Sequence, residues 1–373
     1  MRTLVISDLH LGMRSGADIL TRPLALEILL ERLDGVERLV LLGDTLELRH
    51  GPARDALARA EPVMRAIGDA LGAGREVVIV PGNHDHAIGA GWLDWRGRRV
   101  EPEPLSLEER TPADRASWIA KRLASWLSPA DVAIAYPGLW LREDVYAIHG
   151  HYLDAHVVIP TIERLAAGIM ARLVGAIPDP AKPDDYEAVL APIYALSHSS
   201  AQRGLPHRAT IGSHSAAGTW TALDGAGTRA GRARALALAL PFRAGVLAAN
   251  RAGLGPLQAN LGVQELRRAG LVAMMEVTRR MRLAPAHLVF GHTHRTGKLP
   301  TDSGLGWRTP GGTQLHNAGN WIFETLFMRR GSSSANPYWP GGAIALDADG
   351  PPRLERLLGQ LSEAALTAVP GLP

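Results

Sequence analysis

Val80-Pro81-Gly82-Asn83-His84-Asp85 is the stretch around which the rest of this chain is organised. It follows the apolar run Val77–Val80, whose β-branched residues predict a buried strand, and it begins a polar turn where that strand ends. Open α/β sheets bind their ligands at the carboxyl ends of strands. We therefore expect Asn83, His84 and Asp85 to lie at a functional edge of a sheet.

The same pattern, an apolar run followed at once by metal-binding residue types, recurs four more times along the chain. Each run has the length and composition of a short buried strand. The further blocks are Asp8-x-His10 after Thr3–Ile6, Gly43-Asp44-x-x-Glu47 after Arg38–Leu42, His149-Gly150-His151 after Val145–Ile148, and Gly291-His292-x-His294 after His287–Phe290. We expect all five blocks to meet at one edge.

Composition limits the kind of protein and the kind of metal site. The chain has 373 residues, of which 46% are hydrophobic, so it can form a sizeable core. It contains no cysteine, which excludes disulfides, a cysteine nucleophile and thiolate ligands, and leaves nitrogen and oxygen ligands for any metal. The first strand begins at Thr3 and leaves no room for a cleaved signal peptide, and no apolar run is long enough to span a membrane. We expect a cytoplasmic protein.

Strands alternating with helical patterns predict a layered α/β architecture. The helical patterns that we identify in the first half cover residues 24–33, 53–71 and 113–127, with a further strand at 132–135. Strands are also expected at 315–321 and 343–347, and a closing helix at 353–368. The predicted domains are a core in two parts, 1–159 and 284–350, a helical insert at 160–283, and a C-terminal helix and tail at 351–373.

The insert differs from the core in charge and in its apolar helices. It carries fifteen Lys and Arg against eight Asp and Glu, a net charge of +7, and since the whole chain nets +3, the remainder carries −4. Helices are predicted at 163–177, 233–249 and 264–282. One interpretation is a subdomain that buries apolar faces against the core or a second subunit. The other is a basic lid over an acyl chain or an anionic membrane, with phosphates bound by Arg267, Arg268, Arg279, Arg280 and Arg282.

Seven side chains in the blocks are nitrogen or oxygen ligands, which is more than one ion can use. Two divalent ions bridged by a carboxylate could use them, and mixed imidazole and carboxylate ligands suit zinc, iron and manganese. A pair of ions about 3.5–4 Å apart is the arrangement that stabilises both oxygens of an in-line phosphoryl displacement. The candidate metal ligands are Asp8, His10, Asp44, Asn83, His149, His292 and His294.

These five blocks, in this order, resemble the calcineurin-like metallophosphoesterase superfamily. The resemblance spans Asp8 to His294 but not the insert, and it implies a two-sheet β-sandwich flanked by helices, here with an inserted helical cap. It implies that Asp8, His10, Asp44 and His294 hold one ion, that Asp44, Asn83, His149 and His292 hold the other, and that a hydroxide bridging both ions attacks phosphorus. It also implies that His84 acts on the substrate and that Asp85 orients His84.

Within the superfamily, the chain is most similar to bacterial UDP-2,3-diacylglucosamine hydrolases. It departs from them at His151, where they tend to have aspartate, and it has Glu47 where many other relatives have aspartate; we expect Glu47 to lie outside the metal ligands. The segment Asn317–Trp321 resembles an Asn-x-Gly-x-Trp strand that follows the last block in those enzymes, and we expect it to serve packing.

The favoured function is hydrolysis of a phosphodiester or pyrophosphate bond in a nucleotide or lipid-linked nucleotide, using two divalent ions. Manganese is favoured because the ligand set is hard and mixed, with zinc and iron as alternatives. A phosphomonoesterase with the same mechanism is the next hypothesis, followed by a non-catalytic scaffold and by a peripheral membrane protein. Nucleic acid is disfavoured as a partner because aromatic residues make up only 5% of the chain. The sequence leaves the oligomeric state undetermined.

Overall fold

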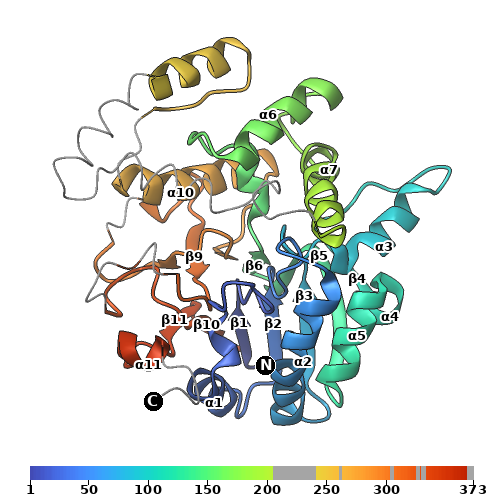
Figure 1. Ribbon diagram of the computed structural model, residues 1–373, viewed down its shortest axis with the longest axis vertical. Coiled ribbons are helices and arrows are strands. Elements are labelled where there is room, and N and C mark those ends of the chain that lie inside the picture. Colours follow the sequence, from blue (N-terminus) through green and yellow to red (C-terminus); the bar gives the residue numbers. More distant parts are fainter. Residues whose placement is uncertain (205–240, 260–262, 303–305, 325–327, 329–332, 368–373) are drawn as a thin grey trace. The chain divides into compact units, whose positions relative to one another are not determined.

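The computed structural model describes residues 1–204, 241–259, 263–302, 306–324, 328 and 333–367 (Figure 1). These residues divide into two compact units. Unit 1 comprises Met1–His151, His198–Gly204 and Ala284–Pro373, and unit 2 comprises Tyr152–Ser197 and Leu205–Leu283. Unit 2 thus begins at Tyr152 rather than at residue 160, and it ends at the last residue of the predicted insert.

Unit 1 is built on one hydrogen-bonded sheet. Its strands pair in the order β11-β10-β1-β2-β3-β5-β6-β7-β9-β8, with β4 paired to β5. The strands are β1 (Thr3–Ile6), β2 (Arg38–Leu42), β3 (Glu76–Val80), β4 (Glu108–Pro112), β5 (Asp131–Arg142), β6 (Val145–Ile148), β7 (His287–Phe290), β8 (Thr296–Gly297), β9 (Gln314–Ala318), β10 (Gly342–Leu346) and β11 (Arg353–Arg356).

The long strand β5 joins two halves of this sheet. Its first residues pair in parallel with β3, and the residues from Gly138 onward pair antiparallel with β6. The change falls at Pro137, which has no amide hydrogen to donate, and at Gly138, where a Cβ atom would collide with the carbonyl of Ala147. The mixed α/β class is confirmed. Two separate sheets are not, because hydrogen bonding is continuous through β5.

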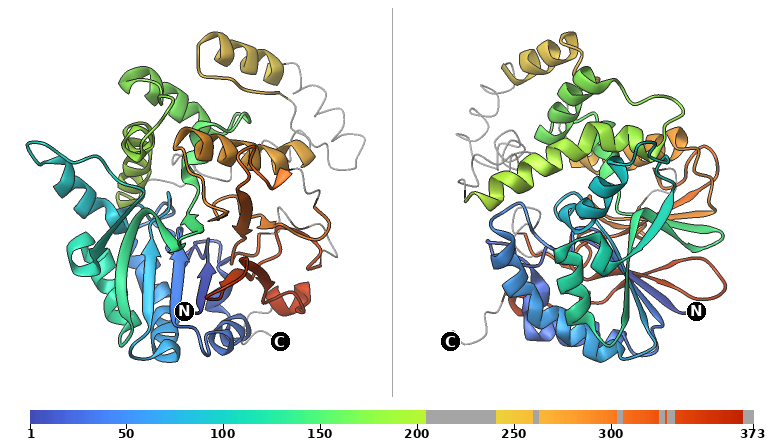
Figure 2. Two further views of the ribbon diagram at one scale, coloured as in Figure 1. Left: turned by 180° about the vertical axis from the view of Figure 1, so that it is seen from behind. Right: turned by 90° about the vertical axis from the view of Figure 1, so that its right-hand side faces the viewer.

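Two hydrophobic clusters lie on opposite faces of the β1–β3 half. One cluster combines Val5, Val40 and Val78 with Leu139 and Val289, so it packs the two halves of the sheet together. The other combines the alternate residues of the same strands with helices α1 (Pro23–Arg32), α2 (Ala53–Leu71) and α5 (Trp118–Leu127). Strands buried on both faces read as continuous apolar runs, which is why the sequence revealed them. Figure 2 shows these helices together on one face of the sheet.

The helices of unit 1 agree with the predictions in part. Helix α2 has the predicted bounds. The predicted helix at 113–127 is two helices, α4 (Ala113–Ala116) and α5, because Ser117 is extended and its hydroxyl accepts the amide hydrogen of Ala120 as an N-cap. The predicted helix at 353–368 is wrong: residues 353–356 form β11, which pairs with β10, and only α11 (Glu363–Thr367) is helical. Helix α3 (Ala87–Gly97) was not predicted.

Unit 2 is helical in the part that the structure describes. It contains α6 (Ile162–Val174), most of α7 (Pro183–Gln202) and α10 (Val263–Arg280), and residues 241–251 are also helical. In the described part of the chain, the 3-10 helices are η1 (Ile19–Thr21) and η2 (His151–Ala155). The residues at 233–240 of one predicted helix lie outside the described residues. No described helix has the length and apolarity needed to cross a membrane.

Candidate metal centre

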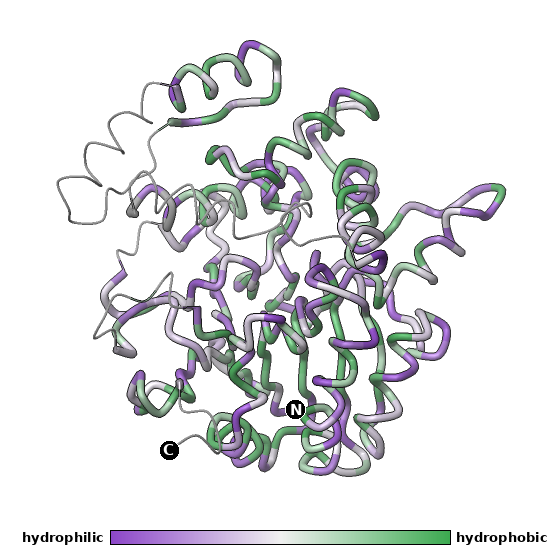
Figure 3. The backbone as a smooth tube through the Cα atoms, in the orientation of Figure 1, coloured by the Kyte–Doolittle hydropathy of each residue, from purple (hydrophilic) through white to green (hydrophobic). Residues whose placement is uncertain are grey.

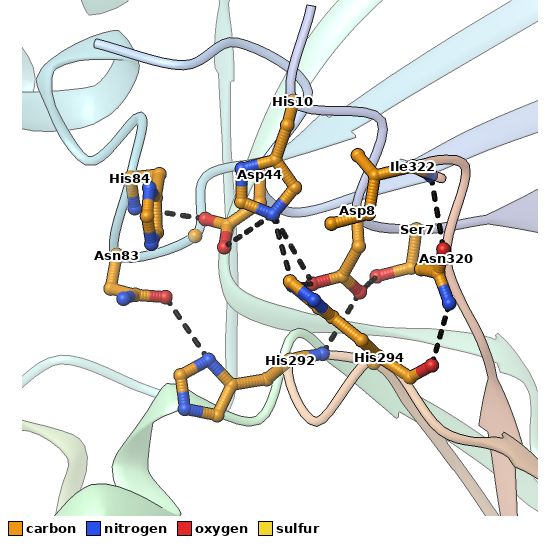
Figure 4. A network of polar contacts seen from close by, with 12 residues as sticks. Ser7, Asp8, His10, Asp44, Asn83, His84, His292, His294, Asn320 and Ile322 are labelled. Atoms are coloured by element: carbon orange, nitrogen blue, oxygen red, sulfur yellow. Dashed lines mark hydrogen bonds and ion pairs between the residues drawn. The ribbon is translucent and has the colours of Figure 1, made fainter. Parts of the chain in front are cut away.

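The five blocks follow the carboxyl ends of β1, β2, β3, β6 and β7, and their side chains meet at one place in unit 1. Figure 4 shows the residues of the other four blocks around Asp44, without His149 labelled. Around Asp8, Nε2 of His294 lies 3.3 Å and Nε2 of His10 lies 3.9 Å from Oδ1 of the carboxylate. The two Nε2 atoms are 3.1 Å apart, and Nε2 of His10 is 3.7 Å from Oδ2 of Asp44. Atoms that share one ion at bonds of about 2.1 Å lie roughly 3 Å apart. We call Asp8, His10, Asp44 and His294 the first set.

A second group of atoms converges on the other side of Asp44. Nε2 of His149 is 3.3 Å from Oδ2 of Asp44 and 3.3 Å from Oδ1 of Asn83, and Nδ1 of His292 is 3.1 Å from the same amide oxygen. We call Asp44, Asn83, His149 and His292 the second set. The structure therefore brings together all seven residues that the sequence singled out, and it divides them around Asp44 as the resemblance implied. Their role as ligands stays a prediction.

Two glycines permit this convergence. A Cβ atom on Gly43 would collide with the ring of His149, and a Cβ atom on Gly82 would collide with the carboxylate of Asp44. Gly43 and Gly82 are thus needed for the close approach of a ligand from another block. Asp44 is further fixed through Oδ1, which accepts the amide hydrogen of His84 at 2.8 Å, so Oδ2 is the oxygen that faces both sets.

The hydrogen bonds behind the histidines show which ring atoms face inward. Nδ1 of His149 lies 2.9 Å from the carbonyl oxygen of Leu42, and Nδ1 of His10 lies 3.1 Å from Glu47. Both partners are acceptors, so each Nδ1 carries the proton and each Nε2 directs a lone pair into the centre. Oδ1 of Asp8 is buried there without a hydrogen-bond partner among the described residues. Converging lone pairs repel unless a cation lies between them, so these residues fit divalent ions.

The amide of Asn83 gives a second reason to expect a metal ion at the second set. In the orientation described above, its oxygen faces His149, His292 and Asp44. Turned by 180°, its nitrogen would lie 3.3 Å from Oδ2 of Asp44 and its oxygen would accept a hydrogen bond from Arg49 at 3.0 Å. In the turned orientation, the amide makes hydrogen bonds to protein groups alone. In the first orientation, its oxygen points at the second set and could bind a metal ion. Loading of the second set therefore requires the first orientation.

The charges of the centre are strongly coupled. Burial acts to lower the pKa of His10, but the hydrogen bond to Glu47 and the charge of Asp44 raise it to about 9. Burial also acts to lower the pKa of His149, but the charge of Asp44 outweighs this effect and raises the pKa to about 10. Burial acts to raise the pKa of Asp44, yet the adjacent histidines hold it well below its usual range. The buried carboxylates thus require positive charge, which protons on the imidazoles or metal ions can supply.

The backbone of the ligand loops is strained. Among the described residues, six non-glycine residues have φ in the left-handed region: Asp8, His10, Asp44, Arg282, His292 and His294. Five of the six are predicted ligands. A left-handed L-residue costs roughly 1–2 kcal/mol, and such strain persists only where the surroundings enforce it. The residue types alone do not predict this conformation: aspartate and histidine adopt it more often than most residues, but still in a minority of cases.

His84 lies beside the centre, and its partner is not the predicted one. Nδ1 of His84 is 2.8 Å from Oε2 of Glu47, the oxygen that also contacts His10. Asp85 does not orient His84. Its carboxylate accepts amide hydrogens from Thr45 at 2.7 Å and from Gly82 at 2.7 Å, because it is buried beneath the two turns. The prediction paired His84 with Asp85 because the two residues are adjacent in the sequence. The three-residue spacing of Asp44 and Glu47 could instead have indicated a second carboxylate that points into the centre.

His151, which departs from the similar bacterial enzymes, does not join either set. It is fully buried, its ring stacks on Tyr136 with the centroids 6.2 Å apart, and its Nε2 lies 3.3 Å from the tyrosine hydroxyl. Burial first, and then the charge of His149, hold the pKa of His151 well below its usual range. His151 therefore lies beside His149, with ring centroids 5.6 Å apart, and contacts Tyr136.

Comparisons with known proteins identify the family of the chain. Residues 1–198, more than half of the chain, match the sequence model of the calcineurin-like phosphoesterase family. Curated relatives include the UDP-2,3-diacylglucosamine hydrolases of Xanthomonas campestris pv. campestris (strain B100), 33% identical over 108 residues, and of Stenotrophomonas maltophilia (strain K279a), 34% identical over 113 residues. Each match covers 29% of this chain and 42% of the relative, so the chain spans less than half the length of these proteins.

Solved structures are similar only at a low level. A dimetal phosphatase from Danio rerio aligns over 94% of this chain and 93% of its own, with 12% identity and a TM-score of 0.33. A cold-active protein-tyrosine phosphatase from Shewanella aligns over 93% of this chain and 75% of its own, with 13% identity and a TM-score of 0.26. Similarities at this level do not establish a shared function.

Proposed function

Because this chain belongs to the calcineurin-like phosphoesterase family, we propose that it hydrolyses a phosphodiester or pyrophosphate bond with two divalent ions. The family supports phosphoester hydrolysis and divalent metal ions in general. The observation that carries the finer proposal is the arrangement of two ligand sets that share Oδ2 of Asp44, with Nε2 of His10 at 3.7 Å and Nε2 of His149 at 3.3 Å. We favour manganese because the ligands are hard oxygens mixed with imidazoles.

The two ions, when bound, would activate water and neutralise charge on the phosphoryl oxygens. Asp44 holds the two sets in register, and the buried carboxylate of Asp8 completes the first. His84 is placed to serve the leaving oxygen: Nδ1 faces Glu47, and Nε2 makes no hydrogen bond among the described residues. Glu47 fixes the tautomer with the proton on Nδ1. Burial lowers the pKa of His84 although the charge of Glu47 opposes the shift, so Nε2 donates a proton to the departing oxygen only after the ring has gained one.

We propose a nucleotide or lipid-linked nucleotide as the substrate. The relatives' names support this class, since those proteins are hydrolases of UDP-2,3-diacylglucosamine. Unit 2 adds a physical reason, because Ile169, Leu173 and Leu196 leave at least half of each side chain in water. Exposed apolar surface of this kind is typical of contact with lipid or with another protein. A phosphomonoesterase stays the alternative.

The basic residues of unit 2 support a lid or membrane contact less well than the sequence indicated. Arg279 pairs with Asp179 at 2.6 Å and with Glu276 at 2.8 Å, and Arg280 pairs with Glu276 at 2.6 Å. Two of the five arginines proposed to meet phosphates are therefore engaged within unit 2. Arg268 is exposed, and the side chain of Arg267 lies outside the described residues. The apolar side chains, rather than these arginines, carry the proposal of lipid contact.

The test is hydrolysis of bis-p-nitrophenyl phosphate and p-nitrophenyl phosphate by chelator-stripped protein, before and after addition of manganese. We expect manganese to restore turnover, with the diester preferred. Glu265→Ala, an exposed substitution in unit 2, is the control for handling and folding. Preference for the monoester would favour the phosphatase alternative. No turnover of either ester with two ions bound would favour a non-catalytic scaffold and contradict the proposal.

A further inference from the structure

The segment Asn317–Trp321 does more than pack. Trp321 fulfils the packing expectation, since its side chain is fully buried and its Nε1 donates to the carbonyl of Gly342 at 3.0 Å. The two asparagines, however, direct their amides at the fifth block, Gly291–His294. They are also buried, and the Oδ1 of each accepts the amide hydrogen of the residue two positions later. The side chains are therefore fixed before they reach the ligand loop.

Asn317 braces the turn that carries His292. The carbonyl of Gly291 accepts the amide hydrogen of Thr293 at 2.7 Å, which closes a three-residue turn around His292 with φ of 66°. This is the rare, strained form of the γ-turn. Nδ2 of Asn317 donates to the carbonyl of Gly291 at 3.1 Å and to the hydroxyl of Thr293 at 2.9 Å. One amide thus holds both ends of the turn whose central residue belongs to the second set.

Asn320 holds the other ligand of the block. Its Nδ2 donates to the carbonyl of His294 at 2.6 Å, and His294 also has a left-handed backbone, with φ of 54° (Figure 4). The next amide along the chain, that of Trp321, donates to the carbonyl of Asp8 at 2.9 Å. Asn320 and its neighbour therefore support two residues of the first set.

We propose that Asn317 and Asn320 are positioning residues. Asn317 orients a ligand of the ion in the second set, and Asn320 orients a ligand of the ion in the first set. The proposal rests on the proposed two-ion function. Partners that orient ligands without touching the metal change its affinity by about 10–100-fold when substituted. Because each asparagine supports a different histidine, each should affect a different ion.

Asn336 offers a matched control. It makes the same local bond, from the amide of Tyr338 to its Oδ1 at 3.0 Å, whereas its Nδ2 donates to Sδ of Met328 at 3.4 Å. The experiment compares Asn317→Ser, Asn320→Ser and Asn336→Ser in the full chain. Manganese binding to chelator-stripped protein is measured by calorimetry, and folding is followed by thermal melting.

We expect Asn336→Ser to bind two ions as the unsubstituted protein does. Asn317→Ser and Asn320→Ser should each bind one ion normally and the other about 10–100-fold more weakly. Combination with His149→Ala, which removes a ligand of the second set, assigns the ion: Asn317→Ser should then add little to the loss, whereas Asn320→Ser should weaken the remaining ion.

Unchanged binding of both ions by the Asn317 and Asn320 variants would overturn the proposal, as would equal weakening of both ions by each variant. If Asn317→Ser does not fold, Asn317→Asp keeps the shape of the side chain without its two donors and takes its place. Failure of the unsubstituted protein to bind two ions would instead overturn the proposed function, so the two failures are distinguishable.

Discussion

The two units place their polar and apolar groups in opposite ways. Unit 1 buries histidines and carboxylates at the ends of apolar strands, and each ligand-bearing loop is held by hydrogen bonds from behind. Among the described residues, eleven large hydrophobic side chains are exposed, and six of them belong to unit 2, although unit 2 is the smaller unit. Figure 3 shows the hydrophobic colour concentrated along the inner strands of unit 1. The difference is consistent with the proposal that unit 1 carries the metal centre and that unit 2 provides apolar surface for lipid contact.

The largest expected effect of a single substitution is at Asp44. Asp44→Ala removes the one oxygen that both sets share, so we expect turnover of bis-p-nitrophenyl phosphate to fall by about 10³-fold or more and bound metal to drop below two ions. Steady-state kinetics and metal analysis after gel filtration measure the two effects. A variant that keeps two ions and near-normal turnover would show that Asp44 is not shared.

The next effect concerns His84 and Glu47. His84→Ala should slow turnover by about 10²–10³-fold while both ions stay bound, because the ring serves the leaving oxygen rather than the metals. Glu47→Gln should slow it similarly, and the double variant should be little slower than either single one, since the two act as a unit. Loss of metal from His84→Ala would contradict the role assigned here.

A substitution at Asp85 tests whether Glu47 rather than Asp85 orients His84. Asp85→Asn should reduce the melting temperature, because the carboxylate that accepts backbone amides of two turns is lost, with a smaller effect on the rate than His84→Ala. Thermal melting beside single-turnover kinetics separates the two. A rate loss equal to that of His84→Ala without a change in stability would restore Asp85 as the partner of His84.

A smaller effect is expected in unit 2, on lipid contact and not on chemistry. The double variant Leu173→Ser and Leu196→Ser removes two exposed apolar side chains, each worth roughly 1.5–3 kcal/mol when buried. Binding to phosphatidylglycerol-containing vesicles in a flotation assay should weaken by at least about tenfold, with turnover of the small diester unchanged. Trp118→Ser in unit 1, where the side chain is 63% exposed, is the control. Equal loss in the control, or no vesicle binding by any form, would contradict lipid contact through unit 2.

The smallest effect is a pH dependence of stability within unit 2. Burial, with the charge of Arg280, lowers the pKa of His156 to about 4, and its Nε2 lies 2.9 Å from the hydroxyl of Tyr186. The unfolded chain binds the proton more readily, so this contribution is fully present above pH 6.5 and is lost as the pH falls from 6.5 to 4. We expect on the order of 1–3 kcal/mol of unfolding free energy to be lost, measured by urea unfolding at pH 7 and pH 4.5. His156→Gln should show a correspondingly smaller pH dependence.

The contrast between the units also explains what the sequence could predict. Strands such as β1, β2 and β7 are buried on both faces, so they read as apolar runs, and the ligand types that follow them are unusual enough to identify the centre. The spacing along the chain could not show that Glu47, rather than the adjacent Asp85, reaches His84, because that depends on how two turns pack. The left-handed backbone of His292 and His294 was equally hidden, since the bonds that enforce it come from Asn317 and Asn320 on another strand.

The secondary-structure prediction was wrong where pairing with another strand or a helix cap decides the conformation. Residues 353–356 have helical spacing, yet they form β11 because β10 offers an unpaired edge. Ser117 divides the helix at 113–127 because its hydroxyl caps α5. Helix α7 carries Pro192 in its interior, a residue that normally predicts a helix end. The insert showed its charge and its apolar helices in the sequence, but not which arginines pair internally.

Electron paramagnetic resonance of the manganese-loaded protein shows whether two ions share Asp44. At two equivalents of manganese per chain, we expect an exchange-coupled signal from ions about 3.5–4 Å apart, and we expect Asp44→Ala to abolish it. Two magnetically isolated ions at saturation, or a single ion per chain, would contradict a shared Asp44.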